Sequence, residues 1–184
     1  SVKEELDDLE RKVDEDVRRI RRELDEVLKE SRENVKRSKD HLDEVLRRVE
    51  EAVKRLIRER GETSELAELV REVLKRVKEL LRRVVEITKD VLRRSEELIR
   101  ELKKELDDVR RRIKELVDRV AEDPDKEKVD RAKKEIEDLL REVRKRVEDV
   151  AREIKRLNED VNRINDKVTR EIEKLLEDVD RKVK

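Results

Sequence analysis

The sequence predicts an all-α fold, a long and nearly straight up-down-up bundle of three helices, and three observations support this. Charged residues make up 59% of the 184 residues and hydrophobic residues 33%, and aromatic residues, Cys and Met are absent. The hydrophobic residues, which are only Leu, Val, Ile and Ala, recur with a period of about 3.6 residues, that of an α-helix. Two short segments interrupt this period, and they contain the single Gly and the single Pro. We therefore expect one domain over residues 1–184, with helices over about 2–60, 65–121 and 124–183.

The first predicted helix, residues 2–60, has a hydrophobic seam that returns to the same angular position every 18 residues. Eighteen residues make five turns of an unstrained α-helix, so this repeat predicts a nearly straight helix. The composition is also typical of coiled coils and other long helices. The positions that mark the repeat are Val2, Ile20, Ser38 and Leu56.

The first interruption, Arg60-Gly61-Glu62-Thr63-Ser64, predicts a turn. Gly61 suits the left-handed position after a helix end, and Ser64 or Thr63 suits the N-cap of the following helix. The second predicted helix, 65–121, then carries the same spacing, marked by Leu66, Val84, Leu102 and Val120.

The second interruption, Glu122-Asp123-Pro124-Asp125, predicts another turn. We expect Asp123 to be the N-cap of the third helix. Pro124 would then take the first helical position, where its missing N–H leaves no hydrogen bond unmade. The third helix, 124–183, repeats the spacing at Val129, Val147, Asn165 and Val183.

Uncharged polar residues inside the predicted helices are confined to three short windows, one near the middle of each helix. If the chain runs up, down and up, the three windows meet, which indicates a buried hydrogen-bond network in an otherwise aliphatic core. A buried amide without a partner costs about 1–3 kcal/mol, so such a network penalises wrong registers, topologies and oligomers. The predicted network consists of Ser31, Asn34, Ser38, His41, Thr88, Ser95, Asn158, Asn162, Asn165 and Thr169.

Short turns also predict a register for this network. The first expected layer contains Ser38, Thr88 and Asn158. A second layer is expected to contain Ser31 and Ser95 facing Ala151, and His41 is expected level with Asn162.

Angular positions predict which helix flanks meet. Asn34 and His41 lie on one flank of the first helix, and the opposite flank of the third helix carries Asn158, Asn162, Asn165 and Thr169. Since the first and third helices run parallel, we expect these two polar flanks to face each other across their shared seam.

Residues that carry chemistry in other proteins form no catalytic or metal-binding pattern here. His41 is the only imidazole and Cys is absent, so we expect no metal site. Ser31 and Ser38 lie inside a helix, which offers no free backbone N–H for an oxyanion hole. A single glycine cannot form a phosphate-binding loop. The sequence therefore predicts no enzyme, no cofactor and no small-molecule substrate, and we interpret the Asn residues of the third helix as structural rather than ligand-binding.

The charge pattern argues against two classes of partner. The 54 basic and 54 acidic residues balance, and the Arg-rich stretches are interleaved with acids and lack aromatic residues for base stacking. No apolar run approaches the roughly 20 residues of a membrane span, and the first residues have no signal-peptide pattern. We therefore expect neither nucleic acid nor membrane as a partner. The expected protein is soluble, without a natural localisation, and cytoplasmic on recombinant expression.

The whole chain resembles de novo designed helical bundles that are built parametrically around buried hydrogen-bond networks. The resemblance rests on the 18-residue repeat, the restricted alphabet, the turns Gly61-Glu62-Thr63-Ser64 and Asp123-Pro124-Asp125-Lys126, and the clustered Ser, Asn, Thr and His residues. It implies that the function is specificity of fold or assembly, with no enzyme site.

Two functional hypotheses follow. The first is a monomeric structural scaffold that requires no partner and whose polar network specifies helix register. The second is an interaction module that supplies three helices of a larger hetero- or homo-oligomeric bundle, with the polar network facing a partner helix. A natural spectrin-like rod fits less well, because such rods normally carry aromatic residues and irregular heptads.

Overall fold

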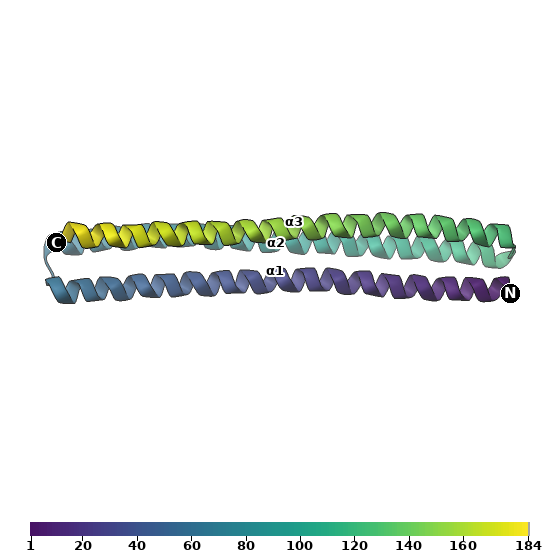
Figure 1. Cartoon of the computed structure of the whole chain (residues 1–184), viewed down its shortest axis with the longest axis horizontal. Coiled ribbons are helices and arrows are strands. Elements are labelled where there is room, and N and C mark those ends of the chain that lie inside the picture. Colours follow the sequence, from purple (N-terminus) through teal and green to yellow (C-terminus); the bar gives the residue numbers. More distant parts are fainter. Residues whose placement is uncertain (184) are drawn as a thin grey trace. The chain divides into compact units, whose positions relative to one another are not determined.

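A computed structural model describes residues 1–183, and they form three long α-helices. The helices are α1 (Val2–Arg60), α2 (Ser64–Glu122) and α3 (Lys126–Val183) (Figure 1). The protein is 96% helical, all three pairs of helices pack against each other, and the described residues contain no strand. This confirms the predicted all-α three-helix bundle.

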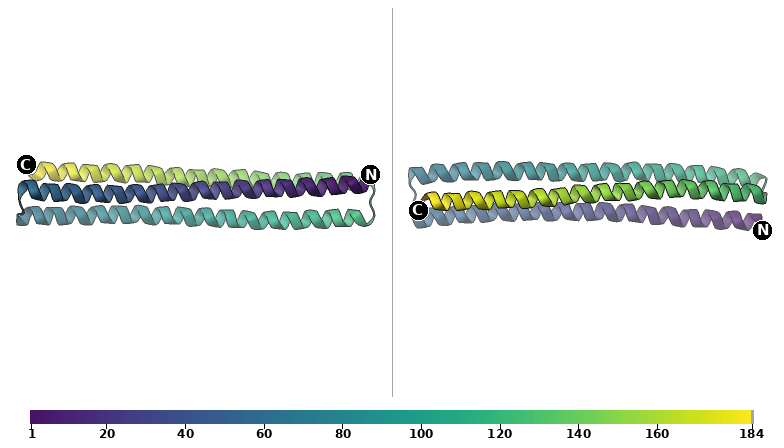
Figure 2. Two further views of the ribbon diagram at one scale, coloured as in Figure 1. Left: turned by 90° about the horizontal axis from the view of Figure 1, so that it is seen from below. Right: turned by 45° about the horizontal axis from the view of Figure 1, so that its top comes forward.

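The chain divides into two compact units, and each helix contributes a segment to both. Unit 1 comprises Ser1–Glu30 and Arg94–Lys155, and unit 2 comprises Ser31–Arg93 and the chain from Arg156 onward. In unit 1 the N-terminus lies at the same end as the α2–α3 turn (Figure 2). In unit 2 the end of α3 lies at the α1–α2 turn, where the Arg60 side chain donates to the Val183 carbonyl at 3.5 Å.

The α1–α2 turn in unit 2 has the predicted chemistry. Gly61 has a φ of 78°, and its N–H donates to the Ile57 carbonyl at 2.9 Å, which closes the end of α1. Thr63 is the N-cap of α2, because its hydroxyl oxygen accepts a hydrogen bond from the Leu66 N–H at 3.2 Å. Ser64 is the first residue of the helix.

The α2–α3 turn in unit 1 differs from the prediction. Asp125, not Asp123, caps α3, because the Asp125 carboxylate accepts from the Glu127 N–H at 3.1 Å. Pro124 therefore precedes the cap instead of occupying the first helical position. Pro124 disfavours helical geometry at the preceding residue, Asp123, so α2 ends at Glu122. Both aspartates are good N-cap residues, and the sequence alone does not choose between them.

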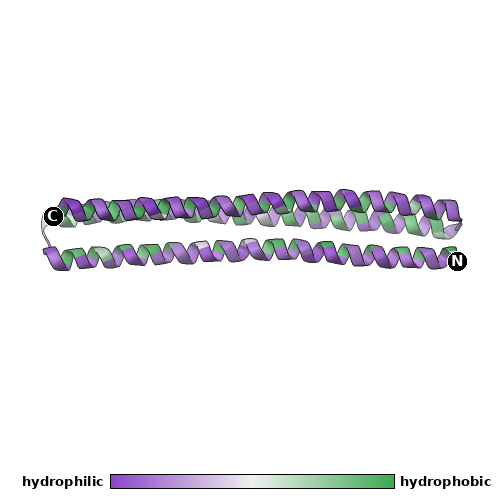
Figure 3. Ribbon diagram, in the orientation of Figure 1, coloured by the Kyte–Doolittle hydropathy of each residue, from purple (hydrophilic) through white to green (hydrophobic). Residues whose placement is uncertain are grey.

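Aliphatic side chains fill each unit between its three helix segments. Hydropathy colouring of the ribbon shows hydrophobic residues recurring as a stripe along the helices (Figure 3). Full burial of a Leu, Ile or Val side chain contributes about 1.5–3 kcal/mol, so these stripes supply most of the stability. In unit 1 the most fully buried side chains include Leu24, Ile99, Leu106, Ile136 and Ile154. The core cluster of unit 2 consists of Leu42, Val45, Val49, Val53, Leu66, Val70, Val73, Val77, Leu81, Val84, Val168, Ile172 and Val179.

Candidate functional site, a polar network between α1 and α3

The polar network lies in unit 2, and the Asn158 amide on α3 joins it to two residues of α1. Asn34 Nδ2 donates to Asn158 Oδ1 at 3.0 Å, and Asn158 Nδ2 donates to Ser31 Oγ at 3.0 Å. Asn34 Nδ2 also lies 3.4 Å from the Asn158 backbone carbonyl. Ser31 is buried, and the two Asn side chains are partly buried. The amide of Asn158 thus acts as both acceptor and donor toward α1.

A second bridge lies two turns further along both helices. Asn165 Nδ2 on α3 donates to Ser38 Oγ on α1 at 2.7 Å. The exposed fractions are only 6% for Asn165 and 3% for Ser38, so this hydrogen bond is screened from water and lies in the core.

His41 closes the network at its solvent edge. Its Nε2 lies 3.1 Å from Thr169 Oγ1, and the Thr169 hydroxyl donates its proton to the Asn165 carbonyl at 2.8 Å. With that proton committed, the Thr169 hydroxyl oxygen has a lone pair to accept a hydrogen bond from Nε2 in the His41 tautomer that carries a hydrogen there. His41 itself is exposed.

These bonds confirm that the polar flanks of α1 and α3 face each other, and they correct the predicted register. The observed partners of Ser31, Ser38 and His41 are Asn158, Asn165 and Thr169. The predicted positions opposite them were Ala151, Asn158 and Asn162. Every observed partner therefore lies about two helical turns further along α3 than predicted.

The corrected register has two physical causes. First, α3 begins at Lys126, two residues later than predicted, which accounts for a part of the displacement. Second, the polar residues on each flank recur at the same two-turn spacing. A displacement by that spacing still sets Asn158 opposite a serine, and sequence pattern alone cannot distinguish the two registers.

The remaining predicted members have different environments. Asn162 is exposed, so its prediction as a buried member of the network is wrong. Thr88 is fully buried, and its hydroxyl donates to the Val84 carbonyl of the preceding turn at 2.7 Å. Ser95 is also fully buried, but it belongs to unit 1, and its pairing with Ser31 stays a prediction.

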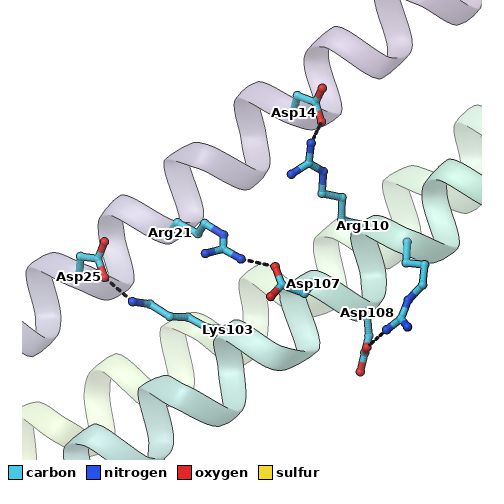
Figure 4. Close-up of polar contacts among 8 residues, drawn as sticks. Asp14, Arg21, Asp25, Lys103, Asp107, Asp108 and Arg110 are labelled. Carbon is cyan, nitrogen blue, oxygen red and sulfur yellow. Dashed lines mark hydrogen bonds and ion pairs between the residues drawn. The ribbon is translucent and has the colours of Figure 1, made fainter.

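Unit 1 has a different set of polar links, between charged side chains, which the sequence analysis did not predict. Three ion pairs join α1 to α2 (Figure 4). They are Asp14–Arg110 at 3.1 Å, Asp25–Lys103 at 2.5 Å, and Arg21–Asp107. Exposed pairs of this kind contribute about 0–1 kcal/mol each, so they guide helix alignment more than they stabilise the unit.

The other two seams of unit 1 also carry ion pairs. Arg144 on α3 lies 2.7 Å from Asp16 on α1, and Arg146 on α3 lies 2.7 Å from Glu105 on α2. In the sequence, these ion pairs could have been predicted from opposite charges that lie at equal heights beside the hydrophobic seams. Long Arg and Lys side chains reach across such a seam even though their heads remain solvated.

One carboxyl in unit 2 has a shifted pKa, and it lies outside the network. The Arg47 guanidinium donates a 2.5 Å hydrogen bond to Glu44 and lowers the pKa of that carboxyl from its ordinary value. Both residues lie on α1, so the bond supports the helix without linking it to another.

The chemistry available to the network is hydrogen bonding between polar side chains. Across residues 1–183 no group of three or more His, Cys, Asp or Glu side chains is arranged to hold a metal ion. A groove of about 620 Å³ between α1 and α3 in unit 1 has a floor of Leu9, Val13, Ile136 and Leu140. Three of these four side chains are buried, so the groove offers little apolar surface.

Comparison of the chain with protein-family models, with curated proteins and with solved structures gives no match. Within residues 1–183 no helix is both long enough and apolar enough to span a lipid bilayer.

Proposed function

We propose that the chain is a designed structural scaffold in which the α1–α3 polar network specifies helix register and assembly. The observation that carries this proposal is the reciprocal bonding of Asn158 with Asn34 and Ser31, repeated two turns away by Asn165 and Ser38. Ser31, Asn34 and Asn158 are bonded to one another within a single chain, which supports a scaffold that satisfies these groups without a second molecule.

The energetic argument concerns what happens when α3 slides along α1. A displacement by one turn breaks the hydrogen bonds of Asn158 and Asn165 to Ser31 and Ser38, and every buried group stranded in this way costs about 1–3 kcal/mol. Aliphatic packing alone is far less selective, because Leu, Val and Ile exchange contacts with small losses. The hydrogen bonds therefore supply the difference between one register and its neighbours.

Regularity of the sequence supports a designed origin. One 18-residue repeat runs through all three helices, and the core uses only four kinds of hydrophobic residue. Uncharged polar residues in the helices are confined to the windows that form the network and its neighbours. This combination follows the rule that polar groups enter a core only as connected networks.

The alternative, an interaction module whose polar flank faces a partner helix, has less support. It was motivated by amides that a partner would need to satisfy. Asn34 and Asn158 are instead bonded to each other.

Light scattering coupled to size exclusion tests the assembly part of the proposal. Because the chain has no Trp or Tyr, refractive index must report the concentration. A scaffold keeps a mass near 22.4 kDa over a hundredfold range of concentration. A doubled or concentration-dependent mass would instead favour the interaction module.

A polar-free variant tests the register part. It combines Ser31→Val, Asn34→Leu, Ser38→Val, Asn158→Leu and Asn165→Leu. Spin labels on cysteines introduced at the exposed positions Asp40 and Lys167 report the alignment of α1 and α3, and no native cysteine interferes.

We expect the polar-free variant to melt at the same or a higher temperature but to show a broadened distance distribution. One-turn or two-turn displacements move the labels by about 5 or 10 Å along the axis. The matched control is Asn162→Leu, which changes an exposed Asn of the same helix and keeps the narrow distribution. A narrow distribution in the polar-free variant would show that the turns and aliphatic packing specify the register without the network.

A further inference from the structure

Asn165 has a buried oxygen that receives no hydrogen bond from the described residues. The side-chain nitrogen donates to Ser38, which orients the amide, and Oδ1 lies on the opposite side of the amide group. The residue is 6% exposed, so bulk water does not reach this oxygen. A buried acceptor left unpaired costs about 1–3 kcal/mol, and native proteins rarely tolerate one.

Asn165 shares a core layer with small polar residues of the other two helices. Ser38 on α1 and Thr88 on α2 are both buried, at 3% and 0% exposure. Along the bundle axis, each of the three residues is displaced by one helical turn, in the same direction, from a member of the unit 2 core cluster. Since the cluster members concerned are packed together, the three polar residues form the next layer. The neighbouring cluster members are Leu42, Val84 and Val168.

Thr88 supplies a second acceptor to this layer. Its hydroxyl proton is donated to the Val84 carbonyl at 2.7 Å, so Oγ1 has lone pairs but no hydrogen to offer. Asn165 Oδ1 and Thr88 Oγ1 therefore cannot bond to each other directly. A single small molecule with two donor hydrogens can form a hydrogen bond to each of these two acceptors.

We propose that one water molecule binds in this layer and donates its two hydrogens to Asn165 Oδ1 and Thr88 Oγ1. Buried waters in proteins satisfy polar groups of this kind, and they need a polar site of about 30 Å³. Ser38 is smaller than Leu42, its counterpart one turn along α1, and this difference in side-chain volume is where we place the water. The bound water joins α2 to the network, which then links all three helices of unit 2.

Magnetic relaxation dispersion of water oxygen-17 tests the proposal, because it counts internal waters that stay bound longer than nanoseconds. We expect Thr88→Val, which keeps the shape but removes the acceptor, to lose one long-lived water relative to the parent chain. Asn165→Leu should lose the same water. The control Asn162→Leu, at an exposed Asn on the same helix, should lose none. Equal counts in the parent chain and both core variants would overturn the proposal.

A second measurement on the parent chain avoids any dependence on folding of the variants. Rotating-frame cross-relaxation should show contacts between a long-lived water and the Asn165 side-chain amide hydrogens. An Asn165 amide that is well resolved and shows no such contact would also overturn the proposal.

Discussion

Asn34 on α1 and Asn158 on α3 bond through their side-chain amides at 3.0 Å, and Asn158 returns a hydrogen bond to α1 through Ser31. Removing either amide breaks a hydrogen bond made by the other, which is partly buried. This interdependence makes the pair suitable for measuring how much the network contributes to helix alignment.

Replacing Asn158 alone should destabilise the protein more than replacing the whole pair. Asn158→Leu leaves the Asn34 amide without its acceptor, and we expect a loss of about 1–3 kcal/mol in the free energy of unfolding. The double variant Asn34→Leu with Asn158→Leu should recover most of that loss. Urea unfolding followed by far-ultraviolet circular dichroism measures both. Equal stabilities for the single and double variants would contradict this expected recovery.

Gly61→Ala should destabilise the α1–α2 turn through backbone strain alone. Gly61 has a φ of 78°, and a Cβ built there meets no atom within 4 Å. An L-residue in this left-handed region costs about 1–2 kcal/mol. Gly61→Asn should cost less, because Asn tolerates the region better than Ala. A larger loss for Asn than for Ala in thermal unfolding would contradict this account.

Asp125→Ala should weaken the start of α3 more than Asp123→Ala does. The Asp125 carboxylate accepts from the Glu127 N–H, and loss of an N-cap costs about 1 kcal/mol. Asp123 instead accepts a hydrogen bond from the exposed Lys128 ammonium at 2.9 Å, which is worth less. Amide hydrogen exchange in the first turn of α3 provides the measurement. Faster exchange in the Asp123 variant than in the Asp125 variant would restore the originally predicted cap.

Charge reversal should reveal the α1–α2 ion pairs of unit 1. Asp107→Arg sets a like charge against Arg21, and the added reversal Arg21→Asp restores an attractive pair. We expect the double-mutant coupling to be below about 1 kcal/mol at low salt, because the pair is solvated. It should shrink further at 1 M NaCl, where the screening length is about 3 Å. A coupling that is independent of salt would mean that the pair acts through packing instead of charge.

Helix number, helix bounds and the facing polar flanks were accessible from the sequence because the hydrophobic period is regular and the breaks are few. Gly61 and Thr63 have local roles that their own chemistry determines, and both behave as predicted. Asp125 illustrates the limit of such reasoning, since two equivalent capping residues flank Pro124 and only the folded backbone selects one.

The alignment of α3 was not accessible for a different reason. Asn158 and Asn165 occupy equivalent positions two turns apart, as do Ser31 and Ser38, so two alignments give chemically similar contacts. The folded chain resolves the choice by satisfying both pairs at once. The ion pairs between helices depend on side-chain reach across a seam, which periodicity does not report.

Repetition of the polar residues at two-turn intervals also gives refolding a near-native kinetic trap. A chain in which α3 docks two turns out of place can still bond Asn158 to Ser38, while the Ser31–Asn158 and Ser38–Asn165 bonds are lost. Escape requires α3 to detach before it can dock again, so a fraction of molecules should refold slowly, with a rate and amplitude independent of protein concentration. Ser38→Val removes the bond that holds the trapped state, and the slow fraction should decrease with it.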